Sequence, residues 1–335
     1  MPLERLIIHA GAGKCGSSTI QTSFSACPTI ASRTGAKVAY GAISGDGRLL
    51  LGDDLRTRAM KQHAKYISSQ TIDSLSSRAL ASLTWERQLS HNKINTLLLS
   101  REAWLNNPDK LRDHVLNQFS VKPKIIIFVR PQVEYLNSAW WQWGAWMSKP
   151  LDAWSTGFIR SSQWSERADR LRKVSGVERV EVRLLSEDVI TDCLELMDCR
   201  PDAVPMNRSN EGLPKEILRL YQRHRSRLRP GPHASGIDFF LRNYLGEKGK
   251  SPWVIGPKRA QRIIEQSRES NERLLELLNP RDQERMRKDL RWWSADAYAD
   301  RELEDWRPRA PNPAELDELT ARLVELAFSD ARNRI

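Results

Sequence analysis

The sequence predicts an α/β fold: a parallel sheet of about five strands flanked by helices, followed by a helical C-terminal part. Five short apolar runs have the length and composition of buried strands. They lie at residues 6–8, 36–40, 96–99, 125–129 and 180–184. Helical spacing of apolar residues separates these runs, first at 17–24, where Ser17 or Ser18 can cap the helix. Buried strands alternating with helices indicate a parallel sheet covered on both faces.

The strand signal stops after about residue 210, and the later segments have helical spacing. Predicted helices there cover residues 213–229, 258–278 and 313–328. An earlier helix is predicted over 72–89, whereas 41–70 has no clear pattern. We therefore expect an α/β core at 1–210 that carries the cofactor site, and a helical region at 211–335 packed on it, together one structural domain.

The charge balance predicts an anionic partner or a basic surface. The chain of 335 residues has 53 Lys and Arg against 42 Asp and Glu, a net charge of +11. Its four cysteines have no zinc-binding spacing, and so few cysteines in so long a chain favour a reducing compartment. The N-terminus lacks the order of a secretory signal, and no apolar run is long enough to cross a membrane. We expect a cytoplasmic protein, with contact to a membrane surface left open.

A glycine-rich turn joins the first predicted strand to the first predicted helix. Residues 9–19 read HAGAGKCGSST. Glycines let the backbone approach an anion, and the helix N-terminus offers unpaired N–H groups and a positive dipole end. Lys14 adds a full charge. The candidate binding residues are Gly11, Gly13, Lys14, Cys15, Gly16, Ser17, Ser18 and Thr19.

The spacing of this turn differs from that of a nucleotide triphosphatase. In that class a Ser or Thr follows the lysine directly, whereas Cys15 and Gly16 follow Lys14 here. A triphosphatase also uses a strand that ends in Asp to help hold magnesium. The third and fourth predicted strands lead into Ser100-Arg101-Glu102 and Arg130 instead. A metal-bound triphosphate is therefore disfavoured.

The turn resembles the 5′-phosphosulfate loop of sulfotransferases that use 3′-phosphoadenosine 5′-phosphosulfate. The bacterial branch commonly has H-x-G-x-x-K-T-G-T-T-S-I-Q, and residues 9–21 read HAGAGKCGSSTIQ. Lys14 and Gly16 match, Ser17 and Ser18 replace threonines, and Cys15 departs from the usual threonine.

A second motif resembles the 3′-phosphate site of the same family. It places Arg130 at the end of a core strand and Ser138 eight residues later. Arginine and a hydroxyl suit a phosphate monoester. Weaker resemblances lie at 35–40, 207–210 and 270–274, so the likeness spans most of the chain.

The resemblance implies a P-loop-like fold and a reaction. It implies transfer of a sulfuryl group from 3′-phosphoadenosine 5′-phosphosulfate to a hydroxyl, with a glycan or glycolipid as acceptor and without a metal. Lys14 would stabilise the leaving oxygen. Glu102 is the first candidate for the base and His9 the second. Structural alternatives are that Glu102 stabilises the N-terminus of the following helix and that His9 is part of the core.

The segment Trp140-Trp-Gln-Trp-Gly-Ala-Trp146 has two interpretations. If residues 133–147 form one helix, Trp140 and Trp143 lie on one stripe with Val133, Leu136 and Met147, and this stripe packs in the core. Trp141 and Trp146 lie off the stripe or at its edge, and they are the candidates for stacking on a sugar or lipid. Packing between helices is the favoured interpretation. The arginine-rich residues 223–229 are either an acceptor site or a solvated helix end, of which we favour the second.

Three other functions remain open at this level. An ATP-dependent kinase would need a modified phosphate loop. A non-catalytic nucleic-acid-binding protein would fit the +11 charge, although no nucleic-acid-binding motif is present. A protein that keeps the sulfotransferase fold without activity would accommodate Cys15. We expect no nucleic-acid partner, and the oligomeric state is not assigned.

Overall fold

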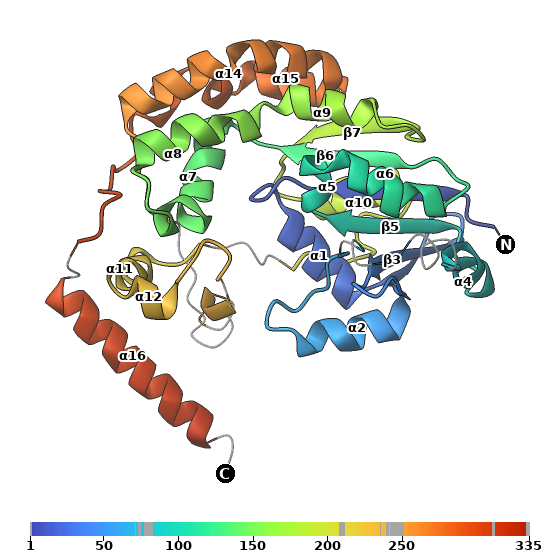
Figure 1. Ribbon diagram of the computed structural model, residues 1–335, viewed down its shortest axis with the longest axis horizontal. Helices are drawn as coiled ribbons and strands as arrows, with labels where there is room; N and C mark the ends of the chain where they lie inside the picture. The colour runs from blue at the N-terminus through green and yellow to red at the C-terminus, as the bar shows by residue number, and fades with distance from the viewer. Residues whose placement is uncertain are drawn as a thin grey trace. The chain divides into compact units, whose positions relative to one another are not determined.

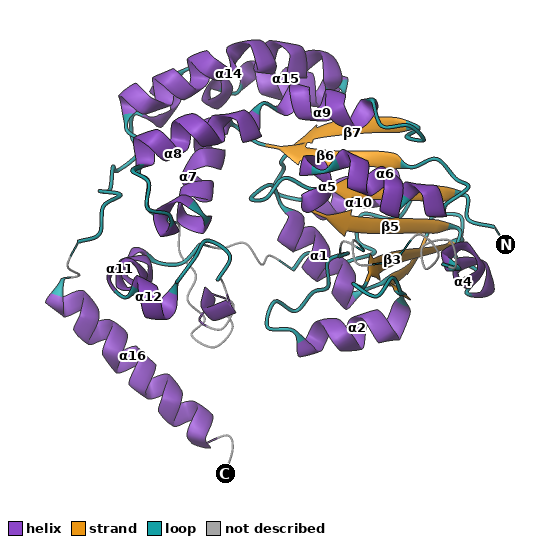
Figure 2. Ribbon diagram, viewed as in Figure 1, coloured by secondary structure: helices purple, strands orange, loops and turns teal. Residues whose placement is uncertain are grey.

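The computed structural model describes residues 2–70, 72, 75–76, 83–207, 212–234, 236–238, 241, 251–309 and 312–332. The chain forms an α/β protein with a mostly parallel central sheet (Figures 1 and 2). It folds into two compact units that interleave along the sequence. Unit 1 contains residues 1–131, 163–210 and 267–292, and unit 2 contains 132–162, 211–266 and 293–335. The division predicted near residue 210 stays a prediction.

The central sheet belongs to unit 1, and all five predicted strands are present in it. They are β1 (Arg5–Ala10), β3 (Lys37–Ile43), β5 (Thr96–Arg101), β6 (Lys124–Val129) and β7 (Arg179–Leu184). These five strands are parallel in the order β3-β5-β1-β6-β7. The side chains of Ile8, Leu99 and Phe128, in the middle strands β1, β5 and β6, are fully buried. The near-continuous apolar runs therefore form strands that are covered on both faces.

The predicted number of strands was wrong, because the described residues form seven. β2 (Thr29–Ala31) and β4 (Leu49–Leu50) both pair antiparallel with β3. They have three and two residues, which is too short for an apolar or alternating pattern to be recognised. The sheet therefore has a mixed edge at β3.

Helices surround this sheet. The helix predicted at 17–24 is confirmed as α1 (Ser17–Ala26). Of the helix predicted at 72–89, residues 73–74 and 77–82 lie outside the described residues. Residues 72, 75–76 and 83–84 are not helical, so the prediction holds only at its end, which α4 covers. The other helices of unit 1 are α2 (Gly52–Lys61), α4 (Trp85–His91), α5 (Ala103–Asn106), α6 (Pro108–His114), α9 (Trp164–Arg172), α10 (Val189–Leu196) and α15 (Pro280–Lys288). Short 3₁₀ turns lie at Leu116–Gln118 and Leu290–Trp292. Helix α14 (Pro257–Leu277) crosses from unit 2 into unit 1.

The described residues of unit 2 are mainly helical. Its helices are α7 (Gln132–Gln142), α8 (Leu151–Phe158), α11 (Lys215–Arg223), α12 (Arg225–Leu228) and α16 (Pro313–Arg332), with 3₁₀ turns at Gly144–Trp146, Ile159–Ser162 and Ala295–Tyr298. Tryptophan rings fill its core, where Trp140 makes edge contacts with Trp154 and Trp306 at centroid distances of 5.5 and 5.7 Å. Eight of the 12 tryptophans of the chain belong to this unit.

The assumption that residues 133–147 form one helix was wrong. Helix α7 ends at Gln142, and a 3₁₀ turn follows at Gly144–Trp146. A Cβ at Gly144 would lie 2.3 Å from the Trp140 ring and 2.8 Å from the Trp154 ring, so only glycine fits between them. The buried stripe consequently stops at Trp140, and Met147 is exposed.

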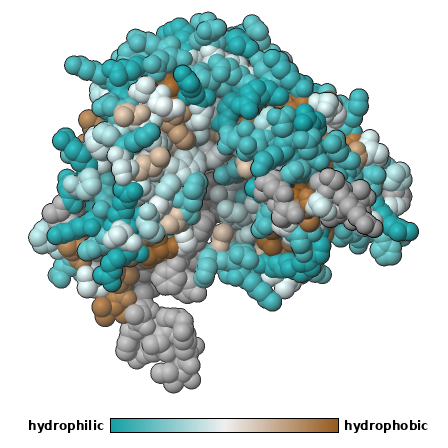
Figure 3. Space-filling view, viewed as in Figure 1, coloured by the Kyte–Doolittle hydropathy of each residue, from teal (hydrophilic) through white to brown (hydrophobic). Residues whose placement is uncertain are grey.

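The surface is largely hydrophilic, as over α14 and α15 in Figure 3. A hydrophobic patch lies on the described part of α16, where Leu323 and Val324 are exposed. Within the ranges that the structure describes, every helix is too short or too polar to traverse a bilayer.

Candidate anion-binding site

The loop of residues 11–16, called the anion loop below, follows β1 at the carboxyl edge of the sheet. Strand β1 lies between β5 and β6, so the segments after these three parallel strands lie at one edge. Glu102 follows β5 and Arg130 follows β6. Ligands of α/β proteins bind at this edge. The topology therefore brings Lys14, Glu102 and Arg130 to one end of unit 1.

The N-terminus of α1 begins in the anion loop, as the sequence predicted, but with a different cap. Gly16 is the N-cap, with φ of +86°, and no side chain caps the helix. A Cβ at Gly16 would lie 3.1 Å from Leu185 and 3.2 Å from Val189. The prediction that Ser17 or Ser18 caps α1 was therefore wrong, because the left-handed backbone and the close packing at this position both favour glycine.

No side chain caps the first turn of α1. It contains no acidic residue, so the positive end of the helix dipole is not offset by a side chain of its own first turn. Lys14 precedes it with φ of +66°, and its side chain is half-buried. The hydroxyl of Ser17 donates to the carbonyl of Ala12 at 3.3 Å, which closes the loop onto the helix. Thr19 is buried, whereas Gly13 and Ser18 are half-exposed.

Glu102 faces the anion loop. Its side chain does not cap α5, although Glu102 is the N-cap residue of that helix. Burial raises the pKa of the Glu102 carboxyl, and the Lys14 charge and a hydrogen bond with Ser17 oppose this shift. A carboxyl in this environment is a stronger base than an ordinary exposed glutamate. The structure thus brings the first candidate base together with the loop lysine.

His9 lies inside the core at the end of β1. Its Nδ1 is 2.8 Å from the Ser100 hydroxyl, which also accepts from the Gln21 amide at 3.2 Å. Its Nε2 is buried and has no hydrogen-bond partner among the described residues. Burial lowers the pKa of His9 to about 3, so the imidazole is neutral at neutral pH. This environment suits the structural alternative better than the role of base.

Cys15 is fully buried within the anion loop. Its backbone N–H donates to the Ala12 carbonyl at 3.1 Å. Burial raises the pKa of the thiol to about 12, although the charges of Arg130 and Arg167 oppose the shift. The thiol is therefore neutral at physiological pH, and the departure from threonine adds no charge to the loop.

Arg130 holds the anion loop directly. Its guanidinium Nη1 donates to the carbonyl of Lys14 at 3.3 Å. The indole N–H of Trp164 on α9 donates to the Arg130 carbonyl at 2.9 Å, which fixes the backbone after β6. The loop and the arginine of the second motif thus meet in unit 1.

Two residues beside the loop were not predicted: Trp164 and Arg167. Arg167 is buried on α9 and donates to the side-chain oxygen of Asn106 on α5. A signal for Arg167 exists in the sequence, because Trp164, Ala168 and Leu171 have the spacing of a buried helix face. Arg167 is on that same face, where an arginine is unusual.

The remaining candidates belong to unit 2. Ser138 is half-buried on α7. Trp141 and Trp146 are 5% and 1% exposed, and their indole N–H groups donate to the carbonyls of Pro252 at 2.8 Å and Trp141 at 3.0 Å. This burial favours the packing interpretation over stacking on an acceptor.

The arginine-rich segment at 223–229 is partly engaged within unit 2. Arg225 donates to the Trp146 carbonyl, and Arg229 is buried in an ion pair with Asp238. In the 207–210 resemblance only Asn207 lies inside the described residues. Its N–H donates to the Ser23 hydroxyl at 2.8 Å.

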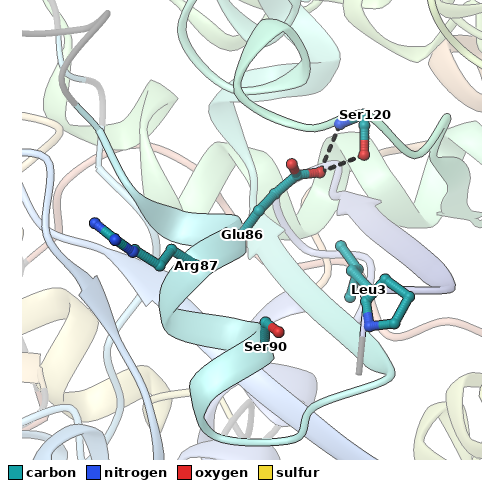
Figure 4. A pocket seen from close by; sticks show the side chains of 6 residues that line it. Leu3, Glu86, Arg87, Ser90 and Ser120 are labelled. Carbon is teal, nitrogen blue, oxygen red and sulfur yellow. Dashed lines mark hydrogen bonds between the residues drawn. The ribbon is translucent and has the colours of Figure 1, made fainter.

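A separate pocket of about 410 Å³ lies at the start of β1, away from the anion loop (Figure 4). Glu86 lines it and accepts hydrogen bonds from the Ser120 N–H at 2.6 Å and hydroxyl at 2.7 Å. The carboxylate is therefore engaged by its own chain. Within the described ranges, His, Cys, Asp and Glu side chains form no cluster of three that could hold a metal ion.

Comparisons with known proteins give one loose likeness. No family model matches the chain, and no curated protein matches it. Among solved structures, a sulfotransferase from Alicyclobacillus acidocaldarius is similar, with a TM-score of 0.34 and 16% sequence identity. The match covers 72% of this chain and 96% of that one. What unit 1 itself defines is an α/β fold with a glycine-rich loop and a helix N-terminus at the carboxyl edge of its parallel strands.

Proposed function

We propose that the protein is a sulfotransferase that moves a sulfuryl group from 3′-phosphoadenosine 5′-phosphosulfate to a hydroxyl of a glycan or glycolipid. One observation carries the proposal: Lys14, Arg130 and the N-terminus of α1, which no side chain caps, meet at one edge of the sheet. A lysine, a helix N-terminus and an arginine at one edge suit a ligand with more than one anionic group.

The side chains present fit such a cofactor. A Cβ at Gly11 would lie 2.3 Å from the Ser17 hydroxyl, so the glycine keeps the loop compact around its N–H groups. Lys14, Ser17 and Ser18 would hold the phosphosulfate end. Arg130 would hold the 3′-phosphate, and the resemblance adds Ser138 to that site. No strand-end aspartate follows β5 or β6, which favours this cofactor over a magnesium-bound triphosphate.

The proposed reaction needs a charge and a base from the chain. When bound, the cofactor supplies the sulfuryl group and the phosphate oxygen that leaves. Lys14 stabilises the negative charge that develops on that oxygen. Glu102 accepts the proton of the acceptor hydroxyl, since it is near Lys14 and its pKa is raised.

Calorimetry with adenosine 3′,5′-bisphosphate tests the cofactor assignment. The wild-type protein is expected to bind one equivalent, and the Lys14→Ala and Arg130→Ala variants are expected to bind it more weakly. Lys37→Ala is a matched control, because Lys37 is an exposed lysine on β3. The assignment is contradicted if the wild type does not bind the bisphosphate, or if the Lys14→Ala and Arg130→Ala variants both bind it with unchanged affinity. Turnover of ATP that depends on magnesium would support a kinase instead.

A transfer assay identifies the acceptor. Labelled sulfate from the cofactor is offered to a panel of glycans and glycolipids, and incorporation into one class is expected. Binding of the bisphosphate without transfer to any member would indicate a protein that kept the site and lost the activity.

Glu102 and His9 can be separated by the pH dependence of the rate. Glu102 must be ionised to accept a proton, so the rate is expected to fall as the pH falls through its raised pKa. Glu102→Gln is expected to lower the rate constant by about 10²–10⁴-fold and to remove this acid limb. His9→Gln is expected to keep the limb, because the pKa of His9 is about 3. Loss of the limb in the His9 variant alone would make His9 the base.

A further inference from the structure

His9 has a polar atom that the proposed function does not use. The side chain is fully buried, and its Nδ1 lies 2.8 Å from the Ser100 hydroxyl, whereas Nε2 has no hydrogen-bond partner among the described residues. A buried nitrogen without a partner loses its hydrogen bond to water and gains none in return. The placement of Nε2 therefore calls for an explanation.

The Nε2 atom of His9 faces the anion loop. A Cβ on Gly11 would lie 3.2 Å from this nitrogen and 2.3 Å from the Ser17 hydroxyl oxygen, so both atoms border the same side of Gly11. Ser17 is the first residue of α1, whose N-terminus no side chain caps, and it is 1% exposed. The imidazole from β1 thus approaches the first hydroxyl of the helix at which we propose that the cofactor binds.

Neighbouring side chains determine which nitrogen of His9 carries the hydrogen. The Ser68 hydroxyl donates its only hydrogen to the Ser100 carbonyl at 3.3 Å, so its oxygen accepts from the Gln21 amide at 3.1 Å. The same amide nitrogen of Gln21 donates to the Ser100 hydroxyl at 3.2 Å. The hydrogen of that hydroxyl is then directed to Nδ1 of His9.

Nε2 is consequently a donor behind the anion loop. The buried imidazole of His9 is neutral and accepts at Nδ1, so its single hydrogen is on Nε2. The Ser17 hydroxyl donates to the Ala12 carbonyl at 3.3 Å, which is long for a hydroxyl donor. It also has a hydrogen bond with Glu102, a carboxyl that takes the proton of the acceptor in the proposed reaction. An anionic oxygen at the helix N-terminus is a stronger acceptor for this hydroxyl than a neutral carbonyl.

We propose that His9 is a positioning residue of the anion loop, whose Nε2–H holds the oxygen of Ser17 while the Ser17 hydroxyl donates to the 5′-phosphate of the bound cofactor. The inference rests on the proposed function, since it assigns a partner to a residue of the same cofactor site. The donors follow one another from Gln21 through Ser100 and His9 to Ser17. His9 keeps its proton throughout.

NMR of the wild-type protein with nitrogen-15-labelled histidine tests the direction of this chain, because long-range proton–nitrogen spectra report which ring nitrogen carries the hydrogen. The free protein is expected to have the Nε2–H form of His9, and adenosine 3′,5′-bisphosphate is expected to shift the Nε2 signal. His9→Gln assigns the signal by removing it. His91, which is exposed on α4, is the internal control and is expected not to shift. The Nδ1–H form, or a His9 signal that bound bisphosphate leaves unchanged, overturns the inference.

Two variants separate the donor from simple packing. The amide nitrogen of glutamine can reach the position of Nε2, whereas that of the shorter asparagine can reach only the position of Nδ1. His9→Asn is therefore expected to weaken bisphosphate binding by about 10-fold, and His9→Gln to retain it within about threefold. Adenosine 3′-monophosphate lacks the 5′-phosphate, and both variants are expected to bind it within about twofold of the wild type. Combined with Ser17→Ala, the His9→Asn loss is expected to be smaller than on its own, because the two side chains act on one phosphate.

The outcomes distinguish this inference from the proposed function. A folded His9→Asn variant that binds the bisphosphate as the wild type does overturns the inference, as does an equal loss for both nucleotides. If circular dichroism shows that neither variant folds, the NMR measurement on the wild type decides. Absence of bisphosphate binding by the wild type refutes the proposed function, whereas a wild type that binds it with His9 in the Nδ1–H form refutes only the role of His9.

Discussion

Replacing Lys14 by methionine is expected to lower the rate constant of sulfuryl transfer by about 10²–10³-fold. Methionine keeps most of the length of the side chain and removes its charge. Lys14 is in the anion loop, beside the N-terminus of α1, which no side chain caps, and near the charge of Glu102. In the proposed reaction, the variant lacks the ammonium group that stabilises the negative charge on the leaving oxygen. Single-turnover transfer from labelled cofactor to the acceptor measures the effect.

Two variants control this experiment. Lys37→Met removes an exposed lysine from the start of β3 and is expected to leave the rate unchanged. Lys14→Arg keeps a positive charge on a bulkier group and is expected to retain more activity than Lys14→Met. Equal rates in the wild type and in Lys14→Met would remove Lys14 from the mechanism.

Replacing Arg229 by methionine is expected to reduce the free energy of unfolding by about 3–5 kcal/mol. Arg229 is 1% exposed, and its ion pair with Asp238 is buried. Its guanidinium also donates to the Gln142 carbonyl at 3.1 Å and lies 5.3 Å from the centroid of the Trp146 ring. Removing it leaves the Asp238 carboxylate buried without its partner. Denaturant unfolding followed by tryptophan fluorescence measures the loss.

A double variant separates the ion pair from simple loss of packing. Arg229→Met combined with Asp238→Leu is expected to regain most of the stability, because neither buried charge remains. Arg227→Met is the control, since Arg227 is exposed on α12, the short helix that ends directly before Arg229. If Arg229→Met is as stable as this control, the buried pair does not stabilise unit 2.

The sheet could be predicted well where local sequence determines it. Residues 125–129 are five consecutive apolar residues, and they form the buried part of β6. β2 and β4 could not be predicted, because so few residues carry no pattern and their pairing with β3 is a long-range property. The end of α7 was missed for a related reason. Gly144 is required by the rings of Trp140 and Trp154, and the second ring comes from a different helix.

The candidate site likewise has parts that the local sequence reveals and a part that it does not. The anion loop could be recognised because its glycines, lysine and hydroxyls are contiguous in the sequence. Arg130 could be recognised because it ends an obvious strand. Arg167 could not be linked to either, since its neighbours Asn106 and Cys15 are distant in the sequence. Only the folded chain brings a buried arginine on α9 to the loop after β1.

The backbone of Lys14 has a consequence for how this chain can vary. Its φ of +66° is a conformation that costs a non-glycine residue roughly 1–2 kcal/mol. Glycine would take it with less strain, so substitution by glycine would relax the loop while removing its charge. Selection for stability alone would favour that change. A lysine at this position therefore marks a place where stability and the proposed anion binding make opposite demands on a single residue.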